Sequence, residues 1–235
     1  MKKILAFVLS IAVVFGMVTT ISACTSETPI VGLICLHDES STYDKNFIDA
    51  FEAACKAKGL KKGQWIIKTG VHEEGSDCKD TAEQFVKLGC KAIFADSFGH
   101  EDYIIQAAKE FPEVQFCHAT GVKAHTENLP NFHNAFASIY EGRYLAGVAA
   151  GLKLQEMIAA NKITDAMKEG ENIKIGYVGA YPYAEVKSGY TSWFLGVRSI
   201  VPNVVMKVKF TNEWYSMEKE LNTANYLISE QHCAI

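Results

Sequence analysis

Apolar residues in the first half of this chain form short continuous runs that alternate with stretches of helical spacing. Strand-like runs occupy 30–36, 65–69, 91–95 and 114–117. Runs of this kind are typical of strands that are buried on both faces of a parallel sheet. The intervening segments 47–58, 76–88 and 101–111 have apolar residues at helical spacing. The first two are each followed by a glycine, which is a common helix end. The pattern predicts a parallel sheet with helices on both faces, joined by right-handed crossovers.

The pattern changes after residue 130. An extended crossing segment is expected at 131–137, followed by a long helix whose small residues allow close packing. A second strand–helix series follows, with the expected elements in the order helix 140–158, strand 174–179, helix 188–200, strand 204–210, helix 217–228 and the start of a strand at 232–235. We therefore expect an α/β protein of two Rossmann-like lobes with parallel sheets, the first at 31–135 and the second at 136–235. Because the last strand is not followed by its helix, we expect the second lobe to be truncated at the C-terminus.

The N-terminal segment is typical of an export signal. Two lysines precede an apolar run over 4–21, and the small residues Ser22 and Ala23 lead to Cys24. This ending resembles the lipobox of bacterial lipoproteins, so we interpret 1–23 as a lipoprotein signal peptide, Cys24 as the lipidation site and 24–30 as a tether. Acyl chains on Cys24 would hold the protein on the extracytoplasmic face of a bacterial cell membrane. A permanent membrane helix and an ordinary cleaved signal with a chance cysteine are the alternatives.

The net charge and the absence of common motifs argue against two classes of function, nucleic-acid binding and enzyme activity. The net charge is −4, the pI is near 6.0 and there is no basic patch, which argues against nucleic-acid binding. The chain lacks the glycine-rich phosphate loops and the nucleophile elbow of common α/β enzymes. We therefore expect no enzyme activity, no catalytic residue and no cofactor. A metal hydrolase stays open as an alternative because histidines follow several of the predicted strands.

The cysteines do not predict a metal site. No pair has Cys-x-x-Cys spacing. Cys35 and Cys117 lie in apolar runs, which is typical of buried thiols and not of metal ligands. Cys55 and Cys78 lie on successive predicted helices and could form a disulfide in an oxidising compartment, an alternative that the sequence leaves open.

The residues that follow the predicted strands are the candidate binding residues. Ligands of parallel α/β sheets bind beyond the carboxyl ends of the strands. His37 and Asp38 follow the first strand, and Asp96, Ser97 and Phe98 follow the third. Their convergence on one edge of the sheet predicts a site for a small polar ligand.

Several segments carry a family resemblance. They are 43–47 with Asp-Lys-Asn-Phe, 141–147 with Glu-Gly-Arg-Tyr-Leu-Ala-Gly, 174–179, 194–198, 201–203 and 211–215. In this order they resemble the basic-membrane-protein family of substrate-binding lipoproteins, of the purine-nucleoside-receptor type. The segment 141–147 is the most specific of them.

The resemblance implies a fold like that of type I periplasmic binding proteins, with two lobes that close on a nucleoside-like ligand and deliver it to ABC permease subunits. It implies that Phe47 and Trp214 stack on the base, and that Asp38 or His37 and Asp44 of the 43–47 segment belong to the site. The chain departs from the family pattern in its longer 36–44 loop, in Asn-Glu at 212–213 and in the 96–100 turn. The alternative is a surface ligand sensor or antigen that serves no permease.

Overall fold

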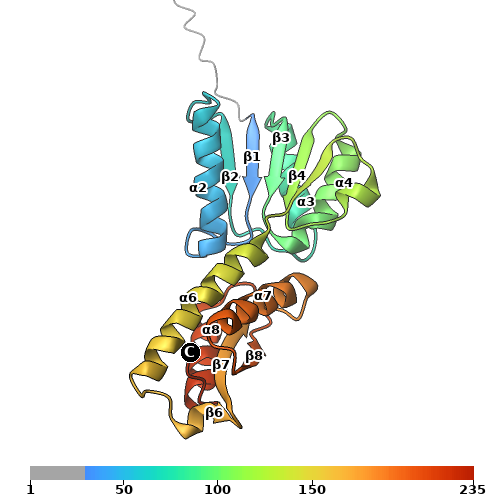
Figure 1. The fold of residues 1–235 in the computed structure, drawn as a ribbon. Helices are drawn as coiled ribbons and strands as arrows, with labels where there is room; N and C mark the ends of the chain where they lie inside the picture. The colour runs from blue at the N-terminus through green and yellow to red at the C-terminus, as the bar shows by residue number, and fades with distance from the viewer. Residues whose placement is uncertain (1–29) are drawn as a thin grey trace, which may run out of the picture. The chain divides into compact units, whose positions relative to one another are not determined.

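The computed structural model describes residues 30–235, which form two compact units that divide between Phe136 and Ala137 (Figure 1). The two units are described separately. The signal peptide at 1–23, the lipidation site Cys24 and nearly all of the 24–30 tether lie outside the described residues. Within 30–235, no helix is long and apolar enough to cross a membrane.

The first unit contains a five-stranded parallel sheet in the order β2-β1-β3-β4-β5. Its strands are β1 (Val31–Ile34), β2 (Trp65–Lys68), β3 (Ala92–Ala95), β4 (Gln115–Ala119) and β5 (Phe132–Ala135). The first four lie where the apolar runs predict them. The fifth corrects the expectation of a crossing segment at 131–137, because this segment pairs with β4 in parallel as the edge strand of the sheet.

Helices cover both faces of this sheet, as the alternating pattern predicts (Figure 1). The helices of the unit are α2 (Thr42–Ala57), α3 (Asp77–Lys87), α4 (Glu101–Glu110), the short α5 (Ala124–Glu127) and the 3-10 turn η1 (Phe98–His100). Ile48 of α2 packs on Leu33 and Cys35 of one face. The helices α3 and α4 pack on the other face, around the fully buried Phe116.

The helix α2 begins five residues earlier than the predicted start at Phe47. Ser41 is its N-cap and accepts a hydrogen bond from the backbone of Asp44. The Ser41 hydroxyl in turn donates to the Asp44 carboxylate. This Ser-x-x-Asp pair stabilises the first turn of a helix and brings Asp44 to the end of the sheet. Phe47 therefore lies in the second turn and not at the helix start.

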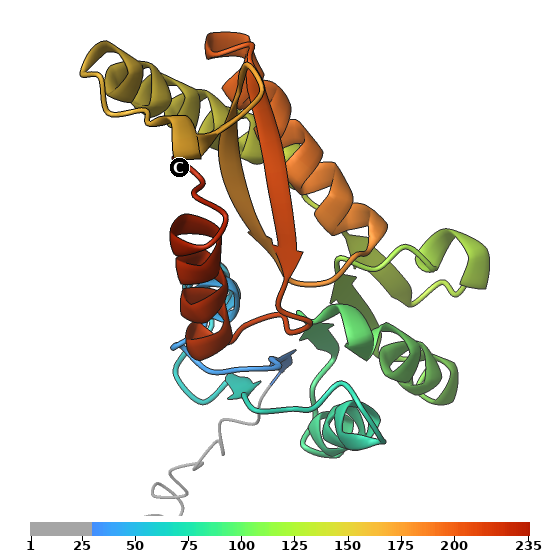
Figure 2. The same cartoon turned by 90° about the horizontal axis from the view of Figure 1, so that it is seen from below.

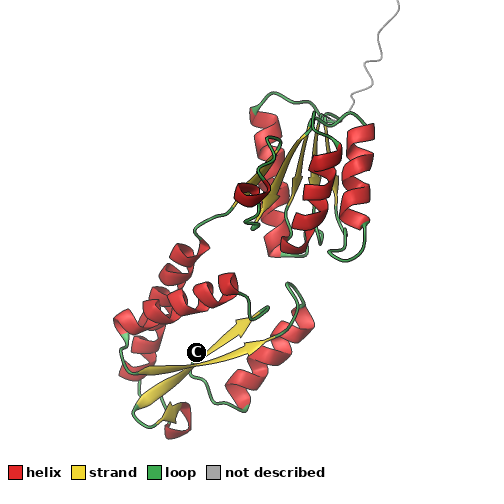
Figure 3. Ribbon diagram, turned by 90° about the vertical axis from the view of Figure 1, so that its right-hand side faces the viewer, coloured by secondary structure: helices red, strands yellow, loops and turns green. Residues whose placement is uncertain are grey.

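The second unit has a small sheet in the order β6-β7-β8, flanked by helices on both sides (Figures 2 and 3). Its elements are α6 (Ile139–Ala159), η2 (Asp165–Met167), β6 (Lys168–Glu169), β7 (Asn172–Gly179), α7 (Ala184–Ile200), β8 (Val204–Phe210) and α8 (Met217–Ser229). The strands β7 and β8 are parallel over seven residue pairs, with Gly179 opposite Phe210 at their carboxyl ends. The short β6 is antiparallel to β7.

The helices α6 and α7 pack with their backbones close together. A methyl group on Gly147 of α6 would lie 2.1 Å from the carbonyl oxygen of Trp193 in α7. A methyl group on Gly196 of α7 would lie 2.3 Å from the carbonyl oxygen of Tyr144. The small residues predicted in the 140–158 helix therefore serve this close approach.

The predicted strand at 232–235 is not assigned as a strand, but its backbone does pair with β7. The Ala234 amide donates to the carbonyl of Lys174, and the Gly176 amide donates to the carbonyl of Ile235. These bonds lie on the side of β7 away from β8, so the last residues extend the sheet.

Candidate functional site

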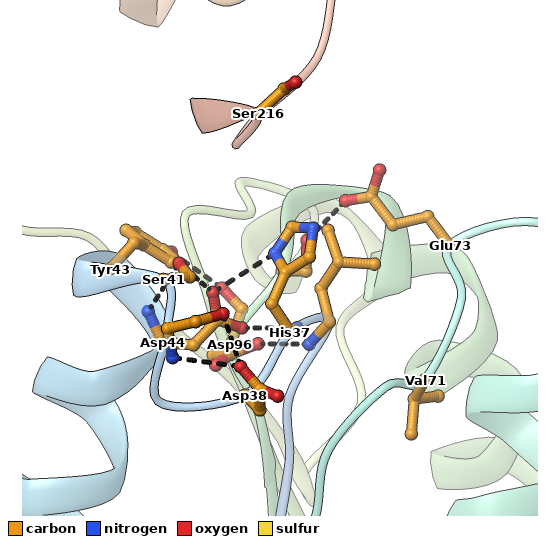
Figure 4. A network of polar contacts seen from close by, with 12 residues as sticks. His37, Asp38, Ser41, Tyr43, Asp44, Val71, Glu73, Asp96 and Ser216 are labelled. Atoms are coloured by element: carbon orange, nitrogen blue, oxygen red, sulfur yellow. Dashed lines mark hydrogen bonds and ion pairs between the residues drawn. The ribbon is translucent and has the colours of Figure 1, made fainter. Parts of the chain in front are cut away.

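The carboxyl edge of the first sheet brings several of the predicted residues together. The strands β1 and β3 are neighbours in parallel, with Ile34 opposite Ala95. Asp96 follows Ala95 directly, and its Oδ1 accepts a hydrogen bond from the amide of Leu36, 3.3 Å away. Figure 4 shows Asp96 beside Asp44, His37 and Tyr43 in one polar network.

Asp44 is the most thoroughly bonded carboxylate of this network. Its Oδ1 accepts from the His37 amide at 2.8 Å, and its Oδ2 accepts from the Ser41 hydroxyl at 2.6 Å. The His37 Nδ1 atom lies 3.3 Å from the same Oδ2. Because Asp44 is buried, these bonds fix the loop between β1 and α2 and set the orientation of the half-buried His37.

Asp96 is fully buried, and its carboxylate accepts fewer hydrogen bonds than that of Asp44. Its Oδ2 atom has no hydrogen-bond partner in the part of the chain that the structure describes. Burial, followed by repulsion from the nearby Asp44 carboxylate, raises the pKa of Asp96 to about 7. The Tyr43 hydroxyl donates to the backbone carbonyl of Asp96 at 2.7 Å, which joins α2 to the end of β3.

Asp38 lies apart from this buried pair. Its side chain is exposed and accepts from the amide and the hydroxyl of Ser40, and these bonds lower its pKa. It lines an open hollow of about 520 Å³ that also includes Glu52 of α2 and Thr69 after β2. His37 and Asp38 are both candidates in the loop after β1. His37 therefore contacts the buried network, whereas Asp38 faces this hollow.

Phe47 and Phe98 are the aromatic candidates of the first unit. Phe47 is half-buried, with its ring centroid 5.0 Å from that of Tyr43 and 5.9 Å from that of Phe94. It thus has one side packed on the sheet and another that is accessible. Phe98 opens the 3-10 turn η1 and is exposed.

Ser97 is bonded to other residues of the protein on both its side chain and its backbone. It is buried, its hydroxyl donates to the Glu73 carboxylate, and its carbonyl accepts from His118 Nε2 at 2.6 Å. The same Glu73 oxygen accepts from the amide of Gly99 at 2.7 Å. Ser97 therefore holds the turn after β3 in place, and its hydroxyl is already used.

Two buried histidines stabilise this edge of the sheet. His100 Nε2 bonds the carbonyl of Val71 at 2.9 Å, as His118 does that of Ser97. Burial lowers the pKa of both imidazoles, an effect that the carbonyl bonds and the carboxylates of Glu73 and Glu101 oppose. Both side chains are therefore neutral in the folded protein at neutral pH.

This burial predicts acid sensitivity. An unfolded histidine has a pKa near 6.5, so below about pH 6.5 the unfolded chain binds more protons than the folded one. The contribution of the two neutral histidines to the free energy of unfolding is therefore fully present above that pH, and it is lost as the pH decreases. Replacing His118 by Gln should reduce the loss of melting temperature between pH 7 and pH 5. The same change at the exposed His125 should leave that loss as it is in the unmodified protein, and an equal pH response of both variants would contradict the prediction.

The second unit has an aromatic cluster at the carboxyl ends of β7 and β8. Tyr181 and Tyr183 stack with ring centroids 5.1 Å apart and planes 10° apart. Trp214 meets Tyr181 edge to face at 4.9 Å and lies 5.9 Å from Tyr183. Flat aromatic surfaces of this kind bind planar ligands by stacking.

The backbone of this unit explains why the cluster forms. The amides of Thr211 and Asn212 donate to the carbonyls of Gly179 and Ala180, so the β7–β8 ladder continues two residues beyond the strands. Asn212 then adopts a left-handed conformation, with φ of 59°. Asparagine tolerates this region better than most residues, so Asn212 can make this turn without a glycine. The turn carries Trp214 back over Tyr181.

The sequence interpretation missed three residues of these edges. Tyr181 and Tyr183 lie in the loop after β7, which ends at Gly179. The rule that picks out residues beyond strand ends would have identified them had it been applied to the second unit. Glu73 follows β2 by five residues, and only the hydrogen bonds of the 97–99 turn reveal its role.

The cysteines of the described residues are all free. Cys55 lies on α2 and Cys78 on α3, on opposite faces of the sheet, so the structure excludes the disulfide that the sequence left open. Cys35 is buried as expected, whereas Cys117 is half-buried. It lines an apolar groove of about 270 Å³ with Phe51 and Phe94.

Comparison with known proteins identifies the family. A family model described as an ABC transporter substrate-binding protein, PnrA-like (Bmp), matches residues 32–235. The chain belongs to the Bmp family. It is 35% identical over 157 residues to a purine-binding protein of Brucella abortus, covering 67% of this chain and 39% of that protein. It is 34% identical over 155 residues to a putative ABC transporter glucose-binding protein of Haloferax volcanii, covering 66% of this chain and 34% of that protein.

Both relatives are longer than the stretch that aligns with this chain, which spans less than two fifths of either. Among solved structures, an ABC transporter solute-binding protein from Conexibacter woesei superposes with a TM-score of 0.61 at 19% identity, covering 86% of this chain and 61% of that one. The fold is therefore that of type I periplasmic binding proteins, as the resemblance implies. The family and this neighbour are solute-binding proteins and not enzymes.

Proposed function

We propose that this Bmp-family protein captures a purine nucleoside or a related purine outside the cytoplasm and delivers it to ABC permease subunits. The observation that carries the proposal is the cluster of Trp214, Tyr181 and Tyr183 at the carboxyl ends of β7 and β8. A planar base gains about 1–3 kcal/mol from stacking on one aromatic ring. The name of the Brucella relative, a purine-binding protein, supports the same ligand class.

The first unit offers its own candidate contacts at the carboxyl edge of its sheet. Phe47 presents an aromatic ring beside Tyr43, and His37 presents a half-buried imidazole oriented by Asp44. Imidazole nitrogens and the exposed carboxylate of Asp38 can bond the polar edge of a base or a ribose hydroxyl. We retain Phe98 as an exposed aromatic candidate. Asp44, Asp96 and Ser97 are buried, so we assign them to positioning these groups and not to ligand contact.

A thermal-shift screen of the protein tests the ligand class. Purine nucleosides and free purines should raise the melting temperature in a concentration-dependent way, since a ligand that binds only the folded state stabilises it by mass action. Pyrimidine nucleosides, sugars and amino acids serve as the comparison sets. Stabilisation by glucose or another sugar alone would overturn the purine proposal and favour the ligand in the name of the Haloferax relative.

We further propose that lipid on Cys24 anchors the protein to the extracytoplasmic face of the membrane. The support is the Ile-Ser-Ala-Cys sequence at the end of the apolar run. The Cys24→Ala variant should lose palmitate labelling and appear in the soluble fraction. Cys35→Ala is a matched control because Cys35 is buried in the first unit, and it should keep both label and membrane association. Labelling of Cys24→Ala at the level of the unmodified protein would contradict the anchor.

A further inference from the structure

A buried cluster of donor atoms lies at the junction of β1, β3 and α2. One carboxylate oxygen each from Asp44 and Asp96 and the Cys35 sulfur all lie within 4.8 Å of one another. The three residues are at most 1% exposed. Their positions follow from the fold, since Cys35 and Asp96 continue adjacent parallel strands at the same level and the capped first turn of α2 holds Asp44 beside them.

The charge of the cluster is not balanced by the protein. Within residues 30–235, neither Asp44 nor Asp96 has an ion pair with a lysine or an arginine, and His37 is the only basic side chain paired with Asp44. The Asp96 Oδ2 atom is buried and receives no hydrogen bond. A buried carboxylate without a partner is strongly unfavourable when it is charged, so either a proton or a bound cation has to neutralise it.

The donor set indicates the kind of partner. Magnesium and calcium prefer shells made of oxygen alone, whereas zinc and similar ions bind thiolate together with carboxylate. In a tetrahedral zinc site neighbouring ligand atoms lie roughly 3.5 Å apart. These three atoms lie within 4.8 Å of one another, so they need to approach by at most about 1.3 Å. A bound cation would also deprotonate the coordinating thiol.

We propose that Cys35, Asp44 and Asp96 form a binding site for a zinc-like divalent cation at the carboxyl edge of the first sheet. On binding, the Cys35 S–H bond breaks, its proton leaves to solvent and the sulfur's electron pair forms the bond to the metal. The cation supplies the missing partner of Asp96 Oδ2. It joins β1, β3 and the first turn of α2, and thereby stabilises the loop that carries His37 and Asp38. The three ligands come from separate elements of the fold. The sequence therefore shows no local spacing, such as Cys-x-x-Cys, that would predict this site.

Cobalt titration tests the proposal. The protein is treated with a chelator, dialysed and titrated with Co²⁺, which takes zinc-like geometry and gives a thiolate-to-cobalt absorption band when sulfur coordinates. We expect one equivalent to saturate the band and Zn²⁺ to abolish it by displacement. Cys35→Ser should eliminate the band, and Asp96→Asn should weaken binding at least tenfold.

Cys90→Ser is the matched control. Cys90 is equally buried in the same unit but lies before β3, at the opposite end of the strand from Asp96, so this variant should keep both the band and the affinity. Circular dichroism melting of each metal-free variant confirms that it is folded. The absence of a thiolate band in the unmodified protein, or equal cobalt binding by Cys35→Ser, would overturn the proposal and leave a proton on Asp96 as the balancing charge.

Discussion

Replacing Gly147 by alanine should destabilise the second unit by about 3 kcal/mol. The added methyl group would lie 2.1 Å from the carbonyl oxygen of Trp193 and 2.9 Å from its carbonyl carbon. These are backbone atoms of α7, so no change of rotamer relieves the clash and the two helices must separate. Overpacking of a well-packed interior typically costs about 1–3 kcal/mol, and a backbone clash this close belongs at the upper limit. The lost packing includes Leu154 and Val197, which are buried between the helices and β7.

Gly142→Ala is the matched control because it makes the same change in the same helix. A methyl group on Gly142 would meet no atom within 4 Å. Alanine favours helices over glycine by roughly 1 kcal/mol, so this variant should be slightly more stable than the unmodified protein. Urea denaturation followed by tryptophan fluorescence measures both, since Trp193 lies at the α6–α7 contact. Equal midpoints for the two variants would show that the helices are not packed this closely.

Replacing Trp214 by alanine should weaken ligand binding roughly 5- to 150-fold, which corresponds to about 1–3 kcal/mol. The indole has the largest ring of the cluster that it forms with Tyr181 and Tyr183. The residue lies in the turn after β8 and is only half-buried, so its loss removes little core packing. The melting temperature of the unliganded protein should therefore change little, and isothermal titration with the purine identified in the screen gives the affinity.

Trp214→Phe separates stacking from other effects. It keeps an aromatic face with a smaller area and should retain most of the affinity. A Phe variant that is as weak as the Ala variant would point to the indole N–H as the important group. An Ala variant with unchanged affinity would exclude Trp214 from the site and would move the search for the stacking ring to the other aromatic candidates, Phe47 first among them.

The strands could be predicted well because parallel strands buried on both faces need continuous apolar runs. The edge strand β5 was missed because its Phe132-His133-Asn134-Ala135 sequence alternates between buried and open positions. Edge strands have one unpaired side and need no such run. The start of α2 was missed because Ser41 and Asp44 lie in a polar stretch that has the composition of a loop, although the Ser-x-x-Asp spacing is itself a capping signal.

The site was less predictable than the fold. Sequence position places His37 and Asp38 at the end of β1 but does not tell which side chain turns inward, because the chain changes direction there. The pairing of Asp44 with Asp96 depends on the register of β1 with β3 and on the exact turn at which α2 begins. Three-dimensional contacts of this kind connect residues 52 positions apart, and no local pattern reports them.

The six cysteines within residues 30–235 have free thiols, and these can report local opening of the protein. Thiol reagents attack the thiolate, and burial raises the pKa of Cys35 and Cys78 and raises that of Cys90 to about 11. Modification of these groups in the folded state therefore has to wait until the surrounding structure opens. Of these described cysteines, five lie in the first unit and Cys233 lies in the second. The labelling rates of the buried thiols consequently report the opening of their own unit without any engineered probe, whereas the half-buried Cys117 can react without such opening.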